Sequence, residues 1–279
     1  MTQPTDRNNQ SALCVLASGS RGNCSVLVTT RADGRRDAVL FDLGLSPRRT
    51  RLALDTLGLS IDDVRAAVVT HLDSDHCHSG WVRGRGDSFP LYVHEHHLDR
   101  AQRGGFIRSR AERFDDRSLA ITDGVRLSAT LMSHDELGVA AFRVTLPCGA
   151  SLGYATDLGR ATRALAEHLA GVDVLAIESN YCPYLQKTSP RPAWLKRRIM
   201  GGAGHLSNAQ SAELVRAIAP GKRVVLLHLS QECNRPEIAL RAHDTERFEI
   251  TVSAQDEPTG WIRVESPDPT GTAPRVEFP

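Results

Sequence analysis

The chain has 279 residues, of which 41% are hydrophobic and 24% are charged, and its formal net charge is +1. These values are typical of a globular protein with a substantial core, and no apolar run approaches the roughly 20 residues of a membrane-spanning helix, so we expect no membrane contact. The near-zero net charge also excludes a global electrostatic field that would attract polyanions.

Both ends of the chain differ in composition from the region between them. The first ten residues lack the apolar run of a signal peptide, and the last dozen are rich in Pro and Gly. We expect a disordered lead over residues 1–10, a single domain over 11–266 and a flexible tail over 267–279. Six scattered cysteines with no C-x-x-C pair argue against a disulfide framework and favour a cytoplasmic location.

The first part of the domain predicts three strands and a helix. Apolar runs predict strands over 12–17, 24–30 and 37–42, and leucines at helical spacing predict a helix over 47–57. The first two strands are joined by SGSRGN at 18–23, a loop of small residues whose backbone can approach a ligand. Taken alone, however, this loop is better interpreted as an ordinary hairpin turn.

A segment dense in metal-binding side chains comes next. Residues 66–69 form a β-branched apolar run that predicts a buried strand, and THLDSDHCHSG follows directly at 70–80. Its potential ligands are His71, Asp73, Asp75 and His76. A strand that holds such a loop rigidly is how a precise metal site is built, and alternate loop residues can converge on one side. A solvated polar loop is the alternative, but this density of carboxylates and imidazoles favours the metal site.

The rest of the domain predicts more strands, helices and two polar segments. Apolar runs predict strands at 91–93, 172–177, 223–227, 248–253 and 260–264. An alternating pattern predicts successive antiparallel strands over 118–155, and helices are expected over 161–169 and from Ser207 or Asn208 to Ala217. The His-rich segment at 94–97 lacks the spacing of a helical metal site, so we expect it to be exposed. Residues 103–118 are expected to be irregular and basic.

Predicted strands repeatedly end in a residue that can bind or orient a metal ion. These residues are Asp42, His71, His134, Asp157, Glu178 and His228. A single histidine at a strand end is usually structural. Six such ends in one chain therefore indicate convergence on one site.

These motifs together resemble those of the metallo-β-lactamase-fold hydrolases. The family motif H-x-H-x-D-H corresponds to HLDSDH at 71–76. The similarity is closest to the YycJ-type, WalJ-like branch of small bacterial exonucleases, through ASGSRGN at 17–23, YATD at 154–157, ESN at 178–180, LKRRI at 195–199, GHLSN at 204–208 and HLSQECN at 228–234. The resemblance implies an α/β fold, the four-layer αββα metallo-β-lactamase sandwich of two mixed sheets flanked by helices.

The resemblance also implies a centre of two divalent metal ions, zinc or manganese. Its ligands would be His71, Asp73 and His134 for one ion, Asp75, His76 and His228 for the other, and Asp157 as the bridge between them. The family usually has histidine at the position of Asp73. A carboxylate there makes the site harder and more anionic, which favours manganese or weakens one ion, and His78 is a substitute ligand to consider.

Further roles follow from the resemblance. Asp42, Glu178 and Asn180 would support the ligands from behind, although a capped strand end explains Glu178 and Asn180 equally well. Asp75 and His205 are the candidate catalytic residues. The candidate substrate-binding residues are Ser20, Asn23, His205, Ser207 and Asn208.

The implied function is phosphodiester hydrolysis by a metal-bound hydroxide, as a DNA exonuclease of 5′-to-3′ polarity, with DNA preferred to RNA as the partner. The first alternative is a small-molecule phosphodiesterase or thioester hydrolase on the same fold, because one fold hosts many chemistries. The second is a metal-stabilised binding or regulatory protein whose catalysis Asp73 impairs.

Overall fold

The computed structural model describes residues 10–31, 33–83, 89–105, 111–134 and 136–266. The expected lead lies outside the described residues except for Gln10, and the expected tail lies outside them entirely. Among the described residues, no helix is both long enough and apolar enough to cross a membrane.

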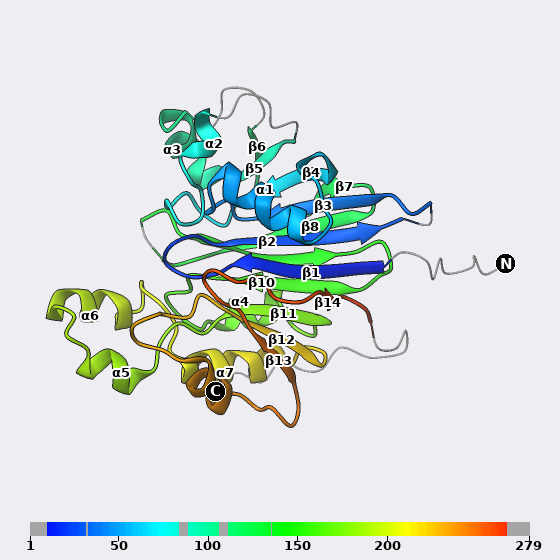
Figure 1. The fold of residues 1–279 in the computed structure, drawn as a ribbon. Coiled ribbons are helices and arrows are strands. Elements are labelled where there is room, and N and C mark those ends of the chain that lie inside the picture. The colour runs from blue at the N-terminus through cyan, green and yellow to red at the C-terminus, as the bar shows by residue number, and fades with distance from the viewer. Residues whose placement is uncertain (1–9, 32, 84–88, 106–110, 135, 267–279) are drawn as a thin grey trace.

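Two mixed seven-stranded sheets form the centre of the described molecule (Figure 1). The first has the order β14 (Ile262–Arg263), β1 (Gln10–Ala17), β2 (Cys24–Thr30), β3 (Arg36–Phe41), β4 (Val64–Val68), β5 (Leu91–His94) and β6 (Ala111–Phe114). The second has the order β13 (Glu249–Val252), β12 (Arg223–Leu227), β11 (Val174–Glu178), β10 (Ser151–Ala155), β9 (Val139–Thr145), β8 (Val125–Met132) and β7 (Leu119–Thr122).

Each sheet combines an antiparallel part with a parallel part. Antiparallel pairing joins β14, β1, β2 and β3, and parallel pairing continues through β4, β5 and β6. In the second sheet, β7 to β10 are antiparallel and β10 to β13 are parallel. Parallel strands end at the same edge of a sheet, so residues that follow β3 and β4, or β11 and β12, are placed together.

The inner strands are buried on both faces. Phe41 on β3 and Tyr154 on β10 pack between the sheets, where their ring centroids lie 5.1 Å apart. Their neighbours Leu40 and Ala155 point the opposite way, toward the outer helices. Because successive side chains of a strand alternate between its faces, strands covered on both sides need continuous apolar runs. This is why apolar runs located these strands in the sequence.

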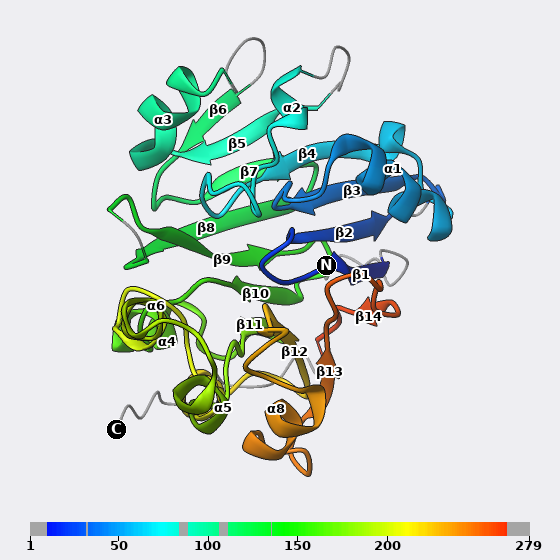
Figure 2. The same ribbon diagram turned by 60° about the vertical axis from the view of Figure 1, so that its left-hand side comes forward.

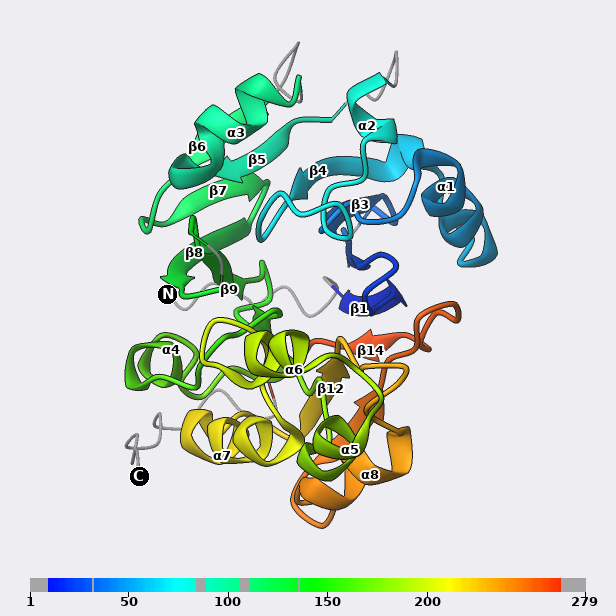
Figure 3. The same cartoon turned by 90° about the vertical axis from the view of Figure 1, so that its left-hand side faces the viewer.

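Helices cover the outer face of each sheet (Figure 2). The first sheet is covered by α1 (Pro47–Thr56), α2 (Gly80–Arg83) and α3 (Leu98–Arg103), with short 3-10 turns η1 (Ile61–Asp63) and η2 (Glu95–His97). The second is covered by α4 (Arg163–His168), α7 (Asn208–Ile218) and α8 (Pro236–Ala242). The expected αββα sandwich is confirmed. Two more helices, α5 (Pro183–Thr188) and α6 (Ala193–Met200), lie beyond the ends of the strands of the second sheet (Figure 3).

Two expectations were wrong. Residues 103–118 are not irregular throughout, because Ala111–Phe114 forms β6 at the sheet edge. The segment 94–97 is not exposed throughout, because His94 and His97 are buried. His97 donates a hydrogen bond to the Gly138 carbonyl at 2.8 Å, and His94 Nδ1 accepts one from the His96 backbone. These internal partners make burial of the two imidazoles tolerable.

Candidate metal centre

The loop after β4 places its histidines inward and its aspartates toward solvent. His71 and His76 are buried, whereas the side chains of Asp73 and Asp75 are 32% and 25% exposed. Backbone hydrogen bonds from residues 76 and 77 to the Asp73 carbonyl, both of 2.8 Å, curl the loop. Gly44 allows its close approach, because a Cβ there would lie 1.7 Å from the Asp75 carbonyl oxygen.

Side chains from both sheets converge on this loop. The side chains form three groups, and within each group the potential ligand atoms lie within 4.8 Å of one another. The groups are His71, Asp73 and His134; His71, His76 and Asp157; and Asp157, Glu178, His205 and His228. Asp75 lies beside them, with its Oδ2 atom 3.7 Å from His76 Nε2. The structure therefore brings the seven sequence-predicted metal ligands to one place.

The backbone adopts an unusual conformation at three of these strand ends. Asp42, Asp157 and His228 have φ angles of 61°, 53° and 54°, in the left-handed region that non-glycine residues seldom occupy. Ala219, in the C-cap of α7, is the one other non-glycine residue with positive φ in the described part of the chain. Such strain persists where surrounding contacts enforce it and is concentrated at functional sites. Here it directs an acidic or imidazole side chain inward at each turn.

The histidines are fixed from behind by hydrogen bonds at Nδ1. His76 Nδ1 lies 2.8 Å from Asp42 Oδ2, and His71 Nδ1 lies 3.0 Å from the Thr70 hydroxyl, which itself donates to Asp42. His134 Nδ1 donates to the carbonyl of Gly204 at 3.0 Å. In each ring this leaves Nε2 for the site, the arrangement that outer groups impose on metal-binding histidines.

Charge and burial show that the centre suits cations. His71 Nε2 is 3.6 Å from Asp157 Oδ2, and neither His71 Nε2 nor His228 Nε2 has a hydrogen-bond partner among the described residues. An unprotonated buried ring nitrogen such as His71 Nε2 needs a proton donor or a cation, because an unpaired polar group in the interior is costly. Imidazole and carboxylate together are donors that divalent zinc and manganese accept. The residues therefore fit such ions.

Burial and neighbouring charges shift the pKa values of these groups. Burial opposes ionisation of Asp157, but His228 and His76 hold its pKa well below the ordinary value. Burial also opposes protonation of His228, yet Asp157 and Glu178 raise its pKa to about 10, and Asp157 and Asp42 raise that of His76. Burial and the neighbouring His76 lower the pKa of His71, which is therefore a neutral imidazole. Protonated histidines thus balance the buried carboxylates when no other cation does.

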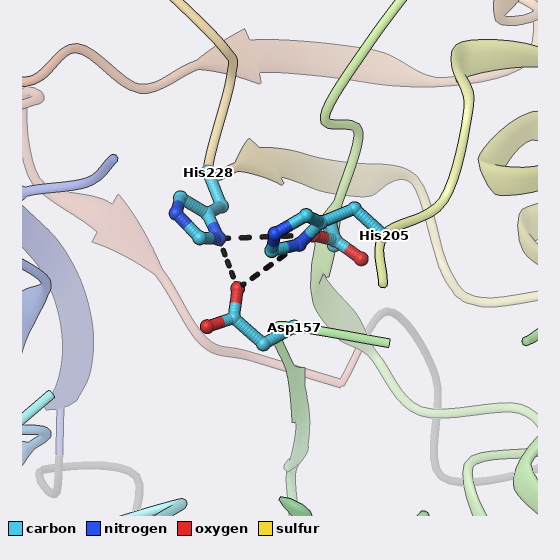
Figure 4. Close-up of side chains that lie close together, drawn as sticks. Asp157, His205 and His228 are labelled. Carbon is cyan, nitrogen blue, oxygen red and sulfur yellow. Dashed lines mark hydrogen bonds and ion pairs between the residues drawn. The ribbon is translucent and has the colours of Figure 1, made fainter. Parts of the chain in front are cut away.

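Glu178 connects the centre to His205. Its Oε1 atom lies 2.7 Å from His205 Nδ1, and its Oε2 atom accepts hydrogen bonds from the backbone N–H groups of Leu158 and Leu206. Figure 4 shows His205 and His228 turned toward Asp157, with which His228 Nδ1 forms an ion pair and from which His205 Nδ1 is 3.6 Å away. Glu178 therefore both caps its strand end and orients His205.

The site opens into a hollow of about 290 Å³. It is lined by Asp73, Asp75, His134, Asp157, His205 and His228 together with Ser20, Asn180, Arg191, Leu195, Arg198 and Ile199, among others. A larger hollow of about 410 Å³ lies against α7 and is lined by Arg160, Gln210 and Glu213 but by none of the predicted ligands. The chemistry therefore belongs to the smaller hollow.

Several predicted site residues have internal partners instead of facing the hollow. Ser207 caps α7 by accepting from the Gln210 backbone, and Asn208 is buried in a network with Asn234. Asn23 Nδ2 lies 3.0 Å from His76 Nε2 and donates to the backbone carbonyls of Gly19 in its own loop and of Asp75. Of the predicted substrate-binding residues, Ser20 and His205 line the hollow.

The two remaining predicted residues also have defined positions. Asn180 donates to the His228 carbonyl at 2.7 Å, which supports that strand end from behind. His78 accepts a hydrogen bond from the Gly80 backbone at the start of α2 and belongs to none of the three potential ligand groups. The geometry thus favours Asp73 over His78 as the nearer donor.

Sequence reasoning missed Arg100. Its Nη2 atom lies 2.8 Å from Asp73 Oδ1, while Asp73 Oδ2 is 3.9 Å from His71 Nε2. The guanidinium of Arg100 offsets the negative charge of Asp73. The Arg100–Asp73 pair therefore has no net charge, as a neutral histidine at position 73 would have none. No spacing in the sequence joins residues 73 and 100, because α3 and the loop meet through the fold.

A family model described as a beta-lactamase superfamily domain matches residues 37–229. The chain is 29% identical over 239 residues to the exodeoxyribonuclease WalJ of Streptococcus pneumoniae, covering 81% of this chain and 84% of that protein. It is 27% identical over 229 residues to the exodeoxyribonuclease YycJ of Bacillus anthracis, with the same two coverages of 81% and 84%.

Solved structures share the architecture at lower identity. Zn²⁺-bound PqqB from Methylobacterium extorquens matches with a TM-score of 0.63 and 16% identity, covering 89% of this chain and 99% of that one. The metallo-beta-lactamase fold protein YhfI from Bacillus subtilis matches with a TM-score of 0.62 and 14% identity, again covering 89% and 99%. At such identities the likeness establishes the fold alone.

Proposed function

The chain belongs to the beta-lactamase superfamily as a metal-dependent hydrolase, and from this premise we propose that it is a DNA exonuclease of 5′-to-3′ polarity. The observation that carries the proposal is the set of histidines whose outer nitrogens are fixed by Asp42, Thr70 and the Gly204 carbonyl. The inner nitrogens of His71 and His76 lie 3.6 and 2.7 Å from Oδ2 of Asp157. The names of its curated relatives support DNA as the substrate.

Seven residues would hold two divalent metal ions in this proposal. They are His71, Asp73 and His134 on one side, Asp75, His76 and His228 on the other, and Asp157 between them. Bound there, such ions would lower the pKa of a bound water toward about 7 and would polarise the phosphoryl group. The carboxylate of Asp73 favours manganese at its side, and Arg100 restrains that carboxylate through one oxygen.

The chain's own groups have complementary tasks. Glu178 holds Nδ1 of His205, so in the imidazolium form the other ring nitrogen can donate its proton to the leaving oxygen of the phosphodiester and leave a neutral imidazole. The carboxylate of Asp75 lines the same hollow. The guanidinium groups of Arg191 and Arg198 also line it and suit contacts with phosphate oxygens. The hollow therefore combines an acid, acidic ligands and phosphate-binding cations.

End-labelled DNA tests the proposed function. Purified protein with known metal content is incubated with single-stranded and duplex DNA labelled at the 5′ or the 3′ end, with added Mn²⁺ or Zn²⁺. We expect metal-dependent release of the 5′ label as the earliest short product. Turnover of a small phosphodiester without DNA cleavage would instead support the phosphodiesterase alternative, and metal binding without any turnover would support a regulatory protein.

A variant of His205 tests the proton-donor role within this proposal. His205→Ala should lower the rate by about 10²–10⁴, the usual contribution of general acid–base catalysis, while metal content stays unchanged. The matched control is His168→Ala, which removes a half-buried histidine of α4 that contacts the Ser128 carbonyl. Loss of metal from the His205 variant would make that residue a ligand and contradict its assigned role.

A further inference from the structure

Helices α5 and α6 form an arm, residues 183–200, that projects beyond the ends of the strands of the second sheet (Figures 1 and 3). The arm has a small apolar cluster of its own, in which Ile199 packs with Tyr181 and Cys233. Leu185, Leu195 and Met200 pack against that cluster. One side of each short helix is thus anchored, which leaves the other side facing solvent.

The solvent side of the arm carries large aromatic residues. Tyr184 on α5 is 73% exposed and Trp194 on α6 is 59% exposed, the two highest values among large hydrophobic residues in the described chain. A cation accompanies each ring on the same helix face, because residues three and four positions apart are neighbours there. Lys187 lies three positions after Tyr184, and Arg197 and Arg198 lie three and four positions after Trp194.

The arm lies in a stretch of the chain whose charged side chains are all positive. Residues 179–212 contain five cations and no Asp or Glu, namely Lys187, Arg191, Lys196, Arg197 and Arg198. Since the net charge of the whole chain is +1, the remaining residues together carry −4. Of the five, Arg191 alone forms an ion pair with a described residue, the exposed Glu232. The arm is therefore positively charged, whereas the rest of the chain has a net negative charge.

The arm is joined directly to the catalytic segment. Arg198 and Ile199 of α6 line the hollow, and the His205 backbone donates to the Ile199 carbonyl at 2.9 Å. Gly204 makes this contact possible, because a Cβ there would lie 2.3 Å from the carbonyl oxygens of Arg198 and Ile199. A ligand lying along α6 would therefore lead to His205 and the metal ligands.

Resting on the proposed nuclease function, we propose that this arm binds an unpaired nucleic-acid strand and directs its end into the hollow. Bases stack on Trp194 and Tyr184, and the phosphates contact Arg197, Arg198 and Lys187. Stacking on exposed aromatic residues with cations along the backbone is how proteins hold single strands without reading their sequence. In a duplex the base faces are covered by neighbouring pairs, so the arm selects single-stranded or frayed ends.

Binding of a hydrolysis-resistant probe tests the arm separately from catalysis. The probe is a fluorescein-labelled single-stranded thymidine oligonucleotide with phosphorothioate linkages, titrated with metal-loaded protein and followed by anisotropy. Trp194→Ala should weaken binding about tenfold, the loss of one base stack, and Tyr184→Ala should act in the same direction. Trp261→Ala, which removes a Trp that is 42% exposed before β14, is the matched control and should bind as the wild type does.

The cations are tested by the salt dependence of binding. Replacing Arg197 and Arg198 with Gln should reduce the slope of log Kd against log salt by about 1.4, because each phosphate contact to a single strand contributes about 0.7. Arg126→Gln is the matched control, since this exposed arginine lies at the start of β8, away from His134 that follows the end of that strand. Thermal unfolding of every variant checks that the fold is intact.

The outcomes separate the arm from the proposed function. Probe binding that depends on Trp194 without any DNA cleavage would support the arm and refute the nuclease. Cleavage with probe binding unchanged in the Trp194 and Tyr184 variants would refute the arm alone. The proposal would also be overturned if Trp261→Ala weakened probe binding as much as Trp194→Ala does, or if Trp194→Ala weakened binding of a blunt duplex as much as binding of the single strand. A wild-type dimer that Trp194→Ala converts to a monomer would overturn it in favour of self-association.

Discussion

The candidate metal centre has a buried half and an open half. His76, Asp157 and His228 have side chains that are at most 3% exposed, whereas those of Asp73 and Asp75 are 32% and 25% exposed. Carboxylates and strained backbone fix the buried half, while an arginine reaching from α3 restrains the open half. Solvent screens the open half, so a substitution there costs less. The carboxylate at position 73 therefore lies in the half of the centre where solvent reduces the cost of its charge.

The largest effect is expected in the buried half, at Asp157. Asp157→Ala should abolish turnover and release metal, because the shared carboxylate has no replacement. Removing it also leaves the buried His76 and His228 without their partner, which should cost about 3 kcal/mol or more of unfolding free energy in the metal-free protein. Elemental analysis and urea unfolding measure both effects. Retained activity would contradict the shared role of this residue.

Metal binding should depend steeply on pH because of the buried half. The raised pKa values of His76 and His228, about 10 for the latter, mean that both carry protons at pH 7, whereas His71 does not. A bound ion must displace these protons, so about two should be released and affinity should fall about 100-fold per pH unit on acidification. Calorimetry in buffers of different ionisation enthalpy measures the release. Binding without proton release would contradict the assignment.

The same pKa shifts determine how the free energy of unfolding varies with pH in protein from which a chelator has removed the metal. A histidine whose pKa is raised from 6.5 to about 10 stabilises the folded state below pH 6.5 and loses that effect as pH rises through 10. Asp157, with a lowered pKa, stabilises above its ordinary value of 3.8 and loses the effect as pH falls. Unfolding free energy should therefore decrease between about pH 6.5 and pH 10. A flat profile in urea titrations would disagree with these shifts.

A smaller effect is expected behind His76, at Asp42. Asp42→Asn should lower metal affinity by about 10- to 100-fold, because the orienting carboxylate is neutralised while its shape is kept. Asp37→Asn is the matched control on β3, since that buried carboxylate pairs with Arg31 and Arg65 and has no contact with a ligand histidine. Equal metal affinities in the two variants would show that Asp42 has no orienting function.

The smallest effect is expected in the open half, at Asp73 and Arg100. Asp73→His should raise zinc affinity, and it should raise it further when Arg100→Gln removes a positive charge from beside the ion. For a pair this exposed, the coupling should be about 0.5–1 kcal/mol. Zinc titrations of both single variants and the double variant give this value. Zinc affinity that is unchanged by Asp73→His would show that Asp73 does not bind the ion.

Periodic features of the sequence predicted much of the fold and the centre. Strands buried on both faces leave continuous apolar runs, and the polar residues after them, such as Asp42, His71 and His228, gave the positions of the potential ligands. The burial of His94 and His97 was not predicted, because their partners are distant carbonyls and side chains that only the fold supplies. Ser207 and Asn208 were predicted to bind substrate because they open a helix whose N-terminus suits phosphate, whereas in the structure the helix cap and its buried network occupy their side chains.

The arm shows a second limit of sequence reasoning. Its helices α5 and α6 are too short for a clear period, and the near-zero net charge of the chain conceals their positive surface. Tyr184 and Trp194 resemble core residues until their exposure is known. Likewise Arg100 became part of the centre only when α3 was placed beside the loop at 70–80.

Anomalous diffraction from crystals of the manganese- or zinc-loaded protein tests the central claim most directly. We predict two peaks that share Asp157, one beside His71, Asp73 and His134 and the other beside Asp75, His76 and His228. Peaks bound elsewhere, or no peak in contact with Asp157, would contradict a dinuclear centre formed by these residues.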